Sequence, residues 1–181
     1  MLQITIPAER GFNEITEEFI SFPAVTLRLE HSLISIQKWE AKWHKSYLNN
    51  KEFTAEEQLD YIRCMSIDSN FDASIFNRLR ISDYEKIRDY IANPMTATVI
   101  HRRKDQSSSS GQFVTAELIY YWMTEFGIPF ECNKWHINQL LTLIEVCSIK
   151  QSPGKKMNKR EAAMMRAAAN ESRRKRLGTR G

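Results

Sequence analysis

Positive charge is concentrated at one end of this chain of 181 residues, and no other feature constrains the fold as strongly. Residues 150–181 contain eleven lysines and arginines against two glutamates, a net charge of +9. The other 149 residues contain 15 basic and 20 acidic side chains, a net charge of −5. The stretch QSPGKK separates the two parts. We therefore predict a folded domain at residues 1–149 and a basic, partly flexible helix or tail at residues 150–181.

Apolar periodicity in residues 1–149 predicts a predominantly helical α+β body with a few short strands. Strands are expected at residues 2–6, 24–29 and 96–101, with a short helix or a loop at residues 11–23 and a loop at 102–112. Helices are expected to begin after the capping residues Ser32, Thr54, Asp72, Ser82 and Asn133, and a further helix is expected from about Thr115. Glu57 and Glu85 would complete capping boxes with Thr54 and Ser82.

The segment LISIQKWEAKWHKSYL is strongly amphipathic. At 100° per residue its large apolar side chains fall within an arc of roughly 120° and its lysines lie opposite. Trp39 and Trp43 therefore point away from Lys38, Lys42 and Lys45. A stacking platform for nucleic acid needs aromatic and basic groups on one surface. We therefore predict that this helix packs its tryptophans into the core.

Candidate catalytic or metal-binding groups are few. Cys132 and His136 are four residues apart, but the chain has neither a CxxC nor an HExxH motif, and His136 is expected to be a core histidine. Glu40 and His44 are expected to form a structural pair. No GxSxG, GxGxxG or P-loop pattern occurs. We therefore expect a protein that is not an enzyme and has no cofactor or metal.

The compartment follows from two further observations. No apolar run approaches 18 residues, and the start MLQITIPAERGF lacks the features of a signal peptide. The three cysteines are odd in number and widely spaced, as in a cytosolic protein with reduced thiols. We expect a soluble cytoplasmic protein that does not act at a membrane.

The segment from Met157 to Arg176 has high helix propensity but a thin apolar stripe of Met157, Met164 and Ala168. Three roles are open: an arm for nucleic acid, a solvated tail, and a helix that docks into an apolar groove. The candidate contact residues are Met157, Met164, Met165, Ala168, Arg173, Arg174, Lys175 and Arg176.

Several segments together resemble a known family. They are LRLEHSLISIQKWEAKWHKSYL, FTAEEQLDYIRCM, AELIYYWMTEFGIPFECNKWHINQLLTLIEVC and the RRKRLGTRG ending. In order and character they resemble the tail assembly chaperones of long-tailed bacteriophages, over about residues 24–181. The resemblance rests on this order and not on a catalytic signature.

The resemblance implies a binding role. Such chaperones coat the long, apolar, helical tape measure protein and keep it soluble while the tail tube polymerises around it. They are then lost from the mature particle. Many also exist in a longer form made by translational frameshifting. The implied partners are therefore the tape measure protein and possibly the tail tube protein, with possible self-association, in the cytoplasm of an infected bacterium. Two alternatives stay open: a small nucleic-acid-binding protein, and a structural head–tail or tail-tube component with an edge strand near residues 96–115.

Overall fold

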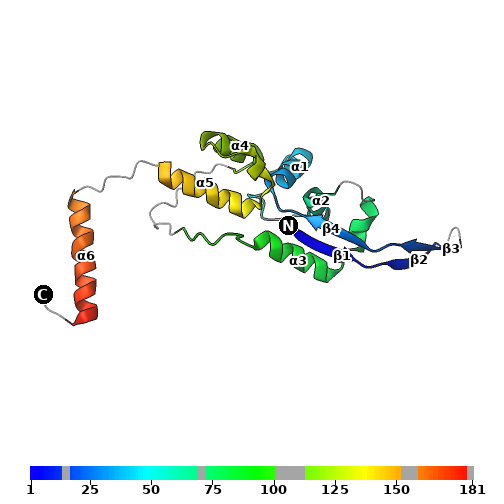
Figure 1. Cartoon of the computed structure of the whole chain (residues 1–181), viewed down its shortest axis with the longest axis horizontal. Helices are drawn as coiled ribbons and strands as arrows, with labels where there is room; N and C mark the ends of the chain where they lie inside the picture. The colour runs from blue at the N-terminus through cyan, green and yellow to red at the C-terminus, as the bar shows by residue number, and fades with distance from the viewer. Residues whose placement is uncertain (14–16, 69–71, 101–112, 152–158, 179–181) are drawn as a thin grey trace. The chain divides into compact units, whose positions relative to one another are not determined.

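The computed structural model describes residues 1–13, 17–68, 72–100, 113–151 and 159–178 (Figure 1). The chain is an α+β protein with a helix-rich body and a C-terminal helix, as predicted. It divides into two compact units, Met1–Cys147 and Ser148–Gly181. The strands are β1 (Leu2–Ile6), β2 (Glu9–Asn13), β3 (Glu18–Phe22) and β4 (Val25–Leu29). The α-helices are α1 (Leu33–Trp43), α2 (Ala55–Met65), α3 (Ile81–Ala92), α4 (Ala116–Glu125), α5 (Ile137–Gln151) and α6 (Lys159–Leu177). The 3₁₀ helices are η1 (Ala73–Arg78) and η3 (Phe130–Lys134).

The four strands form one long antiparallel ribbon. β1 pairs with β4 up to Ile6↔Val25, and β2 pairs with β3 from Glu9↔Phe22 onward, so both pairs keep the same register. Pro7 and Pro23 lie in the short gap between the two pairs, where proline cannot donate to the ladder. The expected helix or loop at residues 11–23 was wrong, because that segment contributes to β2 and β3, each paired across the ribbon.

The inner half of the ribbon and the helices enclose one core. Ile4, Ile6, Leu27 and Leu29 alternate on the face of β1 and β4 that is buried. Trp39 on α1 is fully buried in the same cluster, which confirms its predicted core position. Helix α1, which carries Trp39, therefore has a structural role.

Most predicted helix starts are confirmed. Ser32, Thr54, Asp72 and Thr115 each accept a backbone N–H at the start of their helices. The capping box of Thr54 with Glu57 is also present. These short polar residues satisfy N–H groups that have no partner inside the helix.

Two predicted helix starts were wrong. α3 begins one residue before Ser82, and the Asp83 carboxylate accepts the N–H of Arg80 at 3.1 Å. Asn133 lies within η3, and α5 begins only after His136, whose carbonyl accepts the N–H of Leu140 at 3.1 Å. At α5, the Nδ1 of His136 accepts the N–H of Asn138 at 3.3 Å, so the imidazole takes the place of the expected Asn133 cap.

Two further expectations fail, the strand at residues 96–101 and the pair of Glu40 with His44. The segment 96–100 forms no strand, and the expected loop at 102–112 lies outside the described residues. α1 ends at Trp43 because His44 adopts a left-handed conformation with φ 53°. The predicted Glu40–His44 pair is not what holds this turn. The buried Glu40 carboxylate instead accepts the N–H groups of Tyr47 at 2.8 Å and Ala116 at 2.7 Å.

Candidate protein-binding groove

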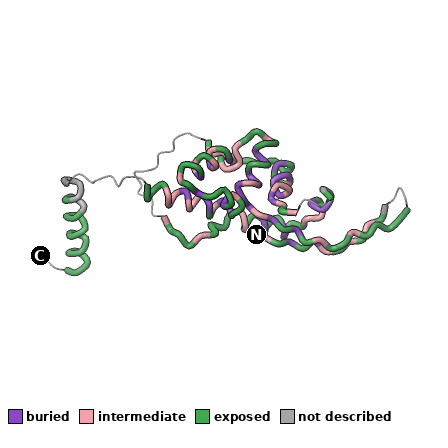
Figure 2. Tube along the Cα trace, turned by 45° about the horizontal axis from the view of Figure 1, so that its top comes forward, coloured by how far each residue is buried: buried purple, intermediate pink, exposed green. Residues whose placement is uncertain are grey.

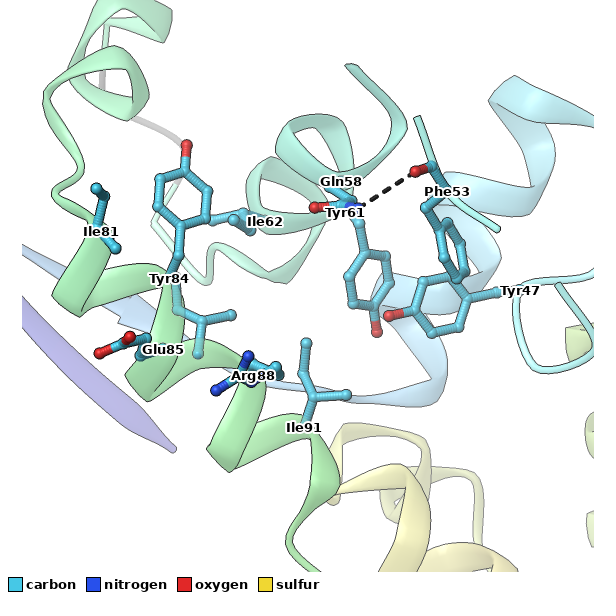
Figure 3. A pocket seen from close by; sticks show the side chains of 11 residues that line it. Tyr47, Phe53, Gln58, Tyr61, Ile62, Ile81, Tyr84, Glu85, Arg88 and Ile91 are labelled. Atoms are coloured by element: carbon cyan, nitrogen blue, oxygen red, sulfur yellow. Dashed lines mark hydrogen bonds between the residues drawn. The ribbon is translucent and has the colours of Figure 1, made fainter. Parts of the chain in front are cut away.

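An apolar groove lies between α2 and α3 (Figure 3). Its volume is about 500 Å³, within the range of sites that bind ligands or side chains of a partner. The lining residues are Tyr47, Phe53, Gln58, Tyr61, Ile62, Ile81, Tyr84, Glu85, Ile87, Arg88 and Ile91. Most of them are aliphatic or aromatic, so the groove favours an apolar occupant.

Helical spacing brings these side chains to the groove. On α2, Gln58, Tyr61 and Ile62 are three and four residues apart and therefore share one face. On α3, Ile81, Tyr84 and neighbouring positions up to Ile91 line the opposite wall. Figure 3 shows the side chains of both helices converging on the space between them. The groove is thus the seam of two helices that carry an apolar face toward each other.

Aromatic rings form the inner end of the groove. The rings of Tyr47 and Tyr61 stack with their centroids 3.9 Å apart, and Phe53 lies 5.1 Å from Tyr47. Gln58 donates a hydrogen bond to the carbonyl of Phe53 at 3.2 Å, which fixes the loop before α2. Burial raises the pKa of both tyrosines, so their hydroxyls stay protonated. This end of the groove is rigid and uncharged.

Two buried histidines lie behind the tyrosines. Nδ1 of His31 contacts the Tyr61 hydroxyl, and the rings of His31 and His136 are 5.0 Å apart. Burial, with a smaller contribution from His136, lowers the pKa of His31 to about 3. The pKa of His136 is also lowered, chiefly by burial. Both imidazoles are therefore neutral near pH 7.

The structure confirms the prediction that His136 is a core residue. It is buried, and its Nε2 lies 3.0 Å from the carbonyl oxygen of Tyr90. Within the described residues, no three His, Cys, Asp or Glu side chains gather closely enough to hold a metal ion.

The lysines of the α1 region are paired with acidic residues of α2. Lys42 lies 2.5 Å from Asp60, whose other oxygen accepts the indole N–H of Trp43 at 2.9 Å. Lys45 lies 2.5 Å from the buried carboxylate of Glu57, and this contact lowers the pKa of Glu57. These partners neutralise the charge that a nucleic-acid platform beside the tryptophans would need.

The candidate residues from the sequence lie in the other unit. Met164, Ala168 and the basic cluster Arg173, Arg174, Lys175 and Arg176 are exposed on α6. Lys175 forms an ion pair with Glu171 at 3.0 Å. Met157 lies outside the described residues, and the side chain of Met165 is not described. None of the eight candidates is among the groove residues, all of which belong to the Met1–Cys147 unit.

The groove was not predicted from the sequence, because the capping residues of α3 indicate where that helix begins and not which face it exposes. A signal was present in the sequence: Ile81, Tyr84, Ile87 and Ile91 recur at helical spacing. Ile87 is buried, whereas Ile81 is 82% exposed. The apolar side of α3 is therefore wider than the part covered by the core.

Among the helices that the structure describes, none is long and apolar enough to span a membrane. Comparison of the chain with models of protein families, with curated proteins and with solved structures found no match.

Proposed function

We propose that this protein is a phage tail assembly chaperone that binds apolar helical segments of the tape measure protein in the groove between α2 and α3. The open apolar groove is the observation that carries the proposal. The tail tube protein is a further proposed partner. In this proposal the protein works in the cytoplasm of the infected bacterium and is absent from the mature virion.

The chemistry of the groove suits an amphipathic helix. Peptide helices bind in apolar grooves through side chains spaced three or four residues apart. The exposed Ile81 and Tyr84 offer contacts at the mouth, and the stacked tyrosines offer a flat aromatic surface farther in. Glu85 and Arg88 place one charge of each sign along α3. A helix with an apolar stripe and mixed polar flanks would match this arrangement.

The groups around the groove support binding more than acid–base catalysis. The two tyrosine hydroxyls remain protonated at neutral pH, and His31, with a pKa of about 3, is a poor base there. The proposed function therefore assigns no catalytic residue and no cofactor.

Co-expression with the tape measure protein tests this proposal. We expect the two proteins to co-purify and the soluble fraction of the tape measure protein to rise. Ile81→Asp places a charge at the mouth of the groove and is expected to weaken co-purification about tenfold or more. Val99→Asp is the matched control, because Val99 is also β-branched, is 74% exposed and does not line the groove.

Three outcomes would count against the proposal. The first is a tape measure protein that stays insoluble and does not co-purify. The second is equal loss of binding in Ile81→Asp and Val99→Asp. The third is the presence of this protein in purified virions at the level of a structural component, detected by mass spectrometry.

The exposed basic cluster on α6 favours nucleic-acid binding as a second candidate function. Among the ion pairs of the described residues, Lys175 is paired with Glu171, whereas Arg173, Arg174 and Arg176 have no acidic partner to compete with phosphate. Phosphate contacts release counterions, so affinity for DNA would fall steeply as salt rises. A flat salt response, or an affinity unchanged by removal of residues 150–181, would eliminate this candidate.

A further inference from the structure

The outer half of the ribbon, β2 (residues 9–13) and β3 (residues 18–22), extends beyond the helices of the body (Figure 1). We call this segment the arm. Because the register is unchanged across the prolines, the pleat also continues. The face that carries Ile4 and Ile6 in β1 therefore carries Arg10 and Phe12 in β2. On the partner strands β4 and β3, the face that carries Leu27 also carries Phe19.

The aromatic pair on this continued face is uncovered. Phe12 and Phe19 are directly paired across the ribbon, with ring centroids 5.1 Å apart. Their exposed fractions are 54% and 79%. Figure 2 shows the contrast, since buried residues alternate along the inner half and exposed residues dominate the arm. Two adjacent aromatic rings on an exposed strand pair are typical of an interaction surface.

A free arm of this kind is also incomplete as a sheet. A two-stranded ribbon is only marginally stable in water on its own, and its outer edges leave backbone N–H and C=O groups without strand partners. Packing of a second layer on the aromatic face would stabilise it.

The base of the arm is held firmly. Arg78 of η1 donates hydrogen bonds to the carbonyl oxygens of Pro7 at 2.5 Å and Pro23 at 3.5 Å, one on each strand. Its guanidinium lies 5.3 Å from the centroid of the Phe22 ring, and its Nε lies 3.5 Å from Glu9. The arm is thus fixed in direction where it leaves the body, which reduces the entropy lost when it binds.

Charges along the aromatic face are arranged with opposite signs at its two ends. Arg10 lies on the aromatic face, on the side of the phenylalanine pair toward the body. Glu17 comes just before β3, on the other side of the pair, whereas Glu18 pairs with Asn13 and lies on the opposite face. All three residues are exposed. If two such faces pack about a two-fold axis through the aromatic pairs, each Arg10 lies beside Glu17 of the other copy. A two-fold contact requires this kind of self-complementary surface.

We infer that the arm is a self-association site through which two copies of this chain pack face to face, with Phe12 and Phe19 at the two-fold axis. Two ion pairs between Arg10 and Glu17 of the other copy set the antiparallel orientation. The contact is small, so the dimer is weak and exchanges readily. This inference is independent of the groove and goes beyond the proposed function.

Sedimentation equilibrium of the full-length chain, at concentrations up to about 1 mM, tests the inference in a range that detects weak interfaces. We expect a reversible monomer–dimer equilibrium. The double substitution Phe12→Ser with Phe19→Ser is expected to weaken the dimer at least about tenfold. Phe113→Ser is the matched control, because Phe113 is 70% exposed and lies outside the arm. Far-ultraviolet circular dichroism verifies that each variant is folded.

Charge reversal makes the test more specific. Arg10→Glu alone, and Glu17→Lys alone, would each bring like charges together twice in a homodimer. Each variant is therefore expected to dimerise about tenfold more weakly. An equimolar mixture of the two variants restores opposite charges at both contacts, and we expect it to recover dimers.

A monomeric wild-type chain over the whole range would overturn the inference. So would a phenylalanine variant that dimerises as the wild type does, or a mixture that associates no better than its components. If the arm instead contacts a different protein, the wild type stays monomeric while the phenylalanine variant loses that partner. Failure here leaves the groove experiment unaffected, because Ile81 and Phe19 lie in separate surfaces.

Discussion

The two halves of the ribbon share one register but have opposite surroundings. In the inner half, Ile6 and Leu27 are completely buried. On the same face of the outer half, Phe12 and Phe19 are exposed. Alternation of apolar and polar side chains dictates a strand with one apolar face, but it does not dictate what covers that face. Helices of the same chain cover the inner half, and we infer that a second copy covers the outer half.

Truncation of a buried side chain in the inner half gives the largest expected effect. Leu27→Ala removes a completely buried side chain and leaves a cavity in the core. We expect the free energy of unfolding to fall by about 2–5 kcal/mol. Urea denaturation followed by tryptophan fluorescence measures this change. A loss below about 1 kcal/mol would mean that the inner half is not part of the cooperative core.

Acidification is expected to have the second-largest effect, a loss of stability of the body. The pKa of His31 is lowered to about 3, below its unfolded value near 6.5. The unfolded chain therefore binds the proton more readily, and stability is lost as the pH falls through 6.5 toward 3. The expected loss approaches 1.4 kcal/mol per pH unit in this window for His31, with a further loss from His136.

Urea denaturation at pH 7.5 and 5.5 measures this dependence above the range in which most carboxylates titrate. His31→Gln is expected to reduce the slope. His44→Gln is the control, because His44 is exposed. The arm contains no histidine, so its hydrogen exchange, corrected for the intrinsic effect of pH, should not follow the same profile. Equal slopes in both variants would contradict the assignment.

Loss of the side chain that connects the two halves should have a smaller effect. Arg78→Ala removes the hydrogen bonds to the carbonyl oxygens of Pro7 and Pro23. We expect a loss of about 1 kcal/mol in global stability and faster hydrogen exchange of the β2 and β3 amides. Arg88→Ala serves as control, since Arg88 is paired only with the exposed neighbour Asp89 among the described ion pairs. Unchanged exchange in the arm would show that Arg78 does not hold it.

Local signals in the sequence predicted much of the body. Ser32 and Thr54 cap their helices as expected, because a side-chain oxygen three residues before a free N–H suffices for this interaction. The core position of Trp39 was predicted correctly from helical periodicity. The start of α3 was misplaced because Asp83 satisfies the N–H of Arg80, and a carboxylate one residue beyond Ser82 was not considered. Two overlapping capping patterns in one stretch are difficult to rank from sequence.

The arm and the groove required tertiary information. β2 and β3 have few buried positions, and Gly11 and Pro23 disfavour strands, so residues 11–23 resembled a loop. Only pairing across the ribbon makes them strands. The groove depends on how α2 lies beside α3, which no single helix pattern contains. The candidate residues on α6 rest on a thin apolar stripe and a basic cluster, and neither identifies the surface that a helix contacts.

The smallest expected effect is that of a substitution in the outer half of the ribbon. Phe19→Ala removes a ring that is 79% exposed and has a cross-strand contact with Phe12. In a dilute solution, where the chain is monomeric, we expect a change of less than about 0.5 kcal/mol in the free energy of unfolding. Urea denaturation at low protein concentration measures it, beside Leu27→Ala under the same conditions. A loss near that of Leu27→Ala would mean that the ring already packs within the monomer and is not available to a second copy. A near-zero change in the free energy of unfolding, together with loss of the dimer at high concentration, would show that Phe19 contributes to association and not to folding.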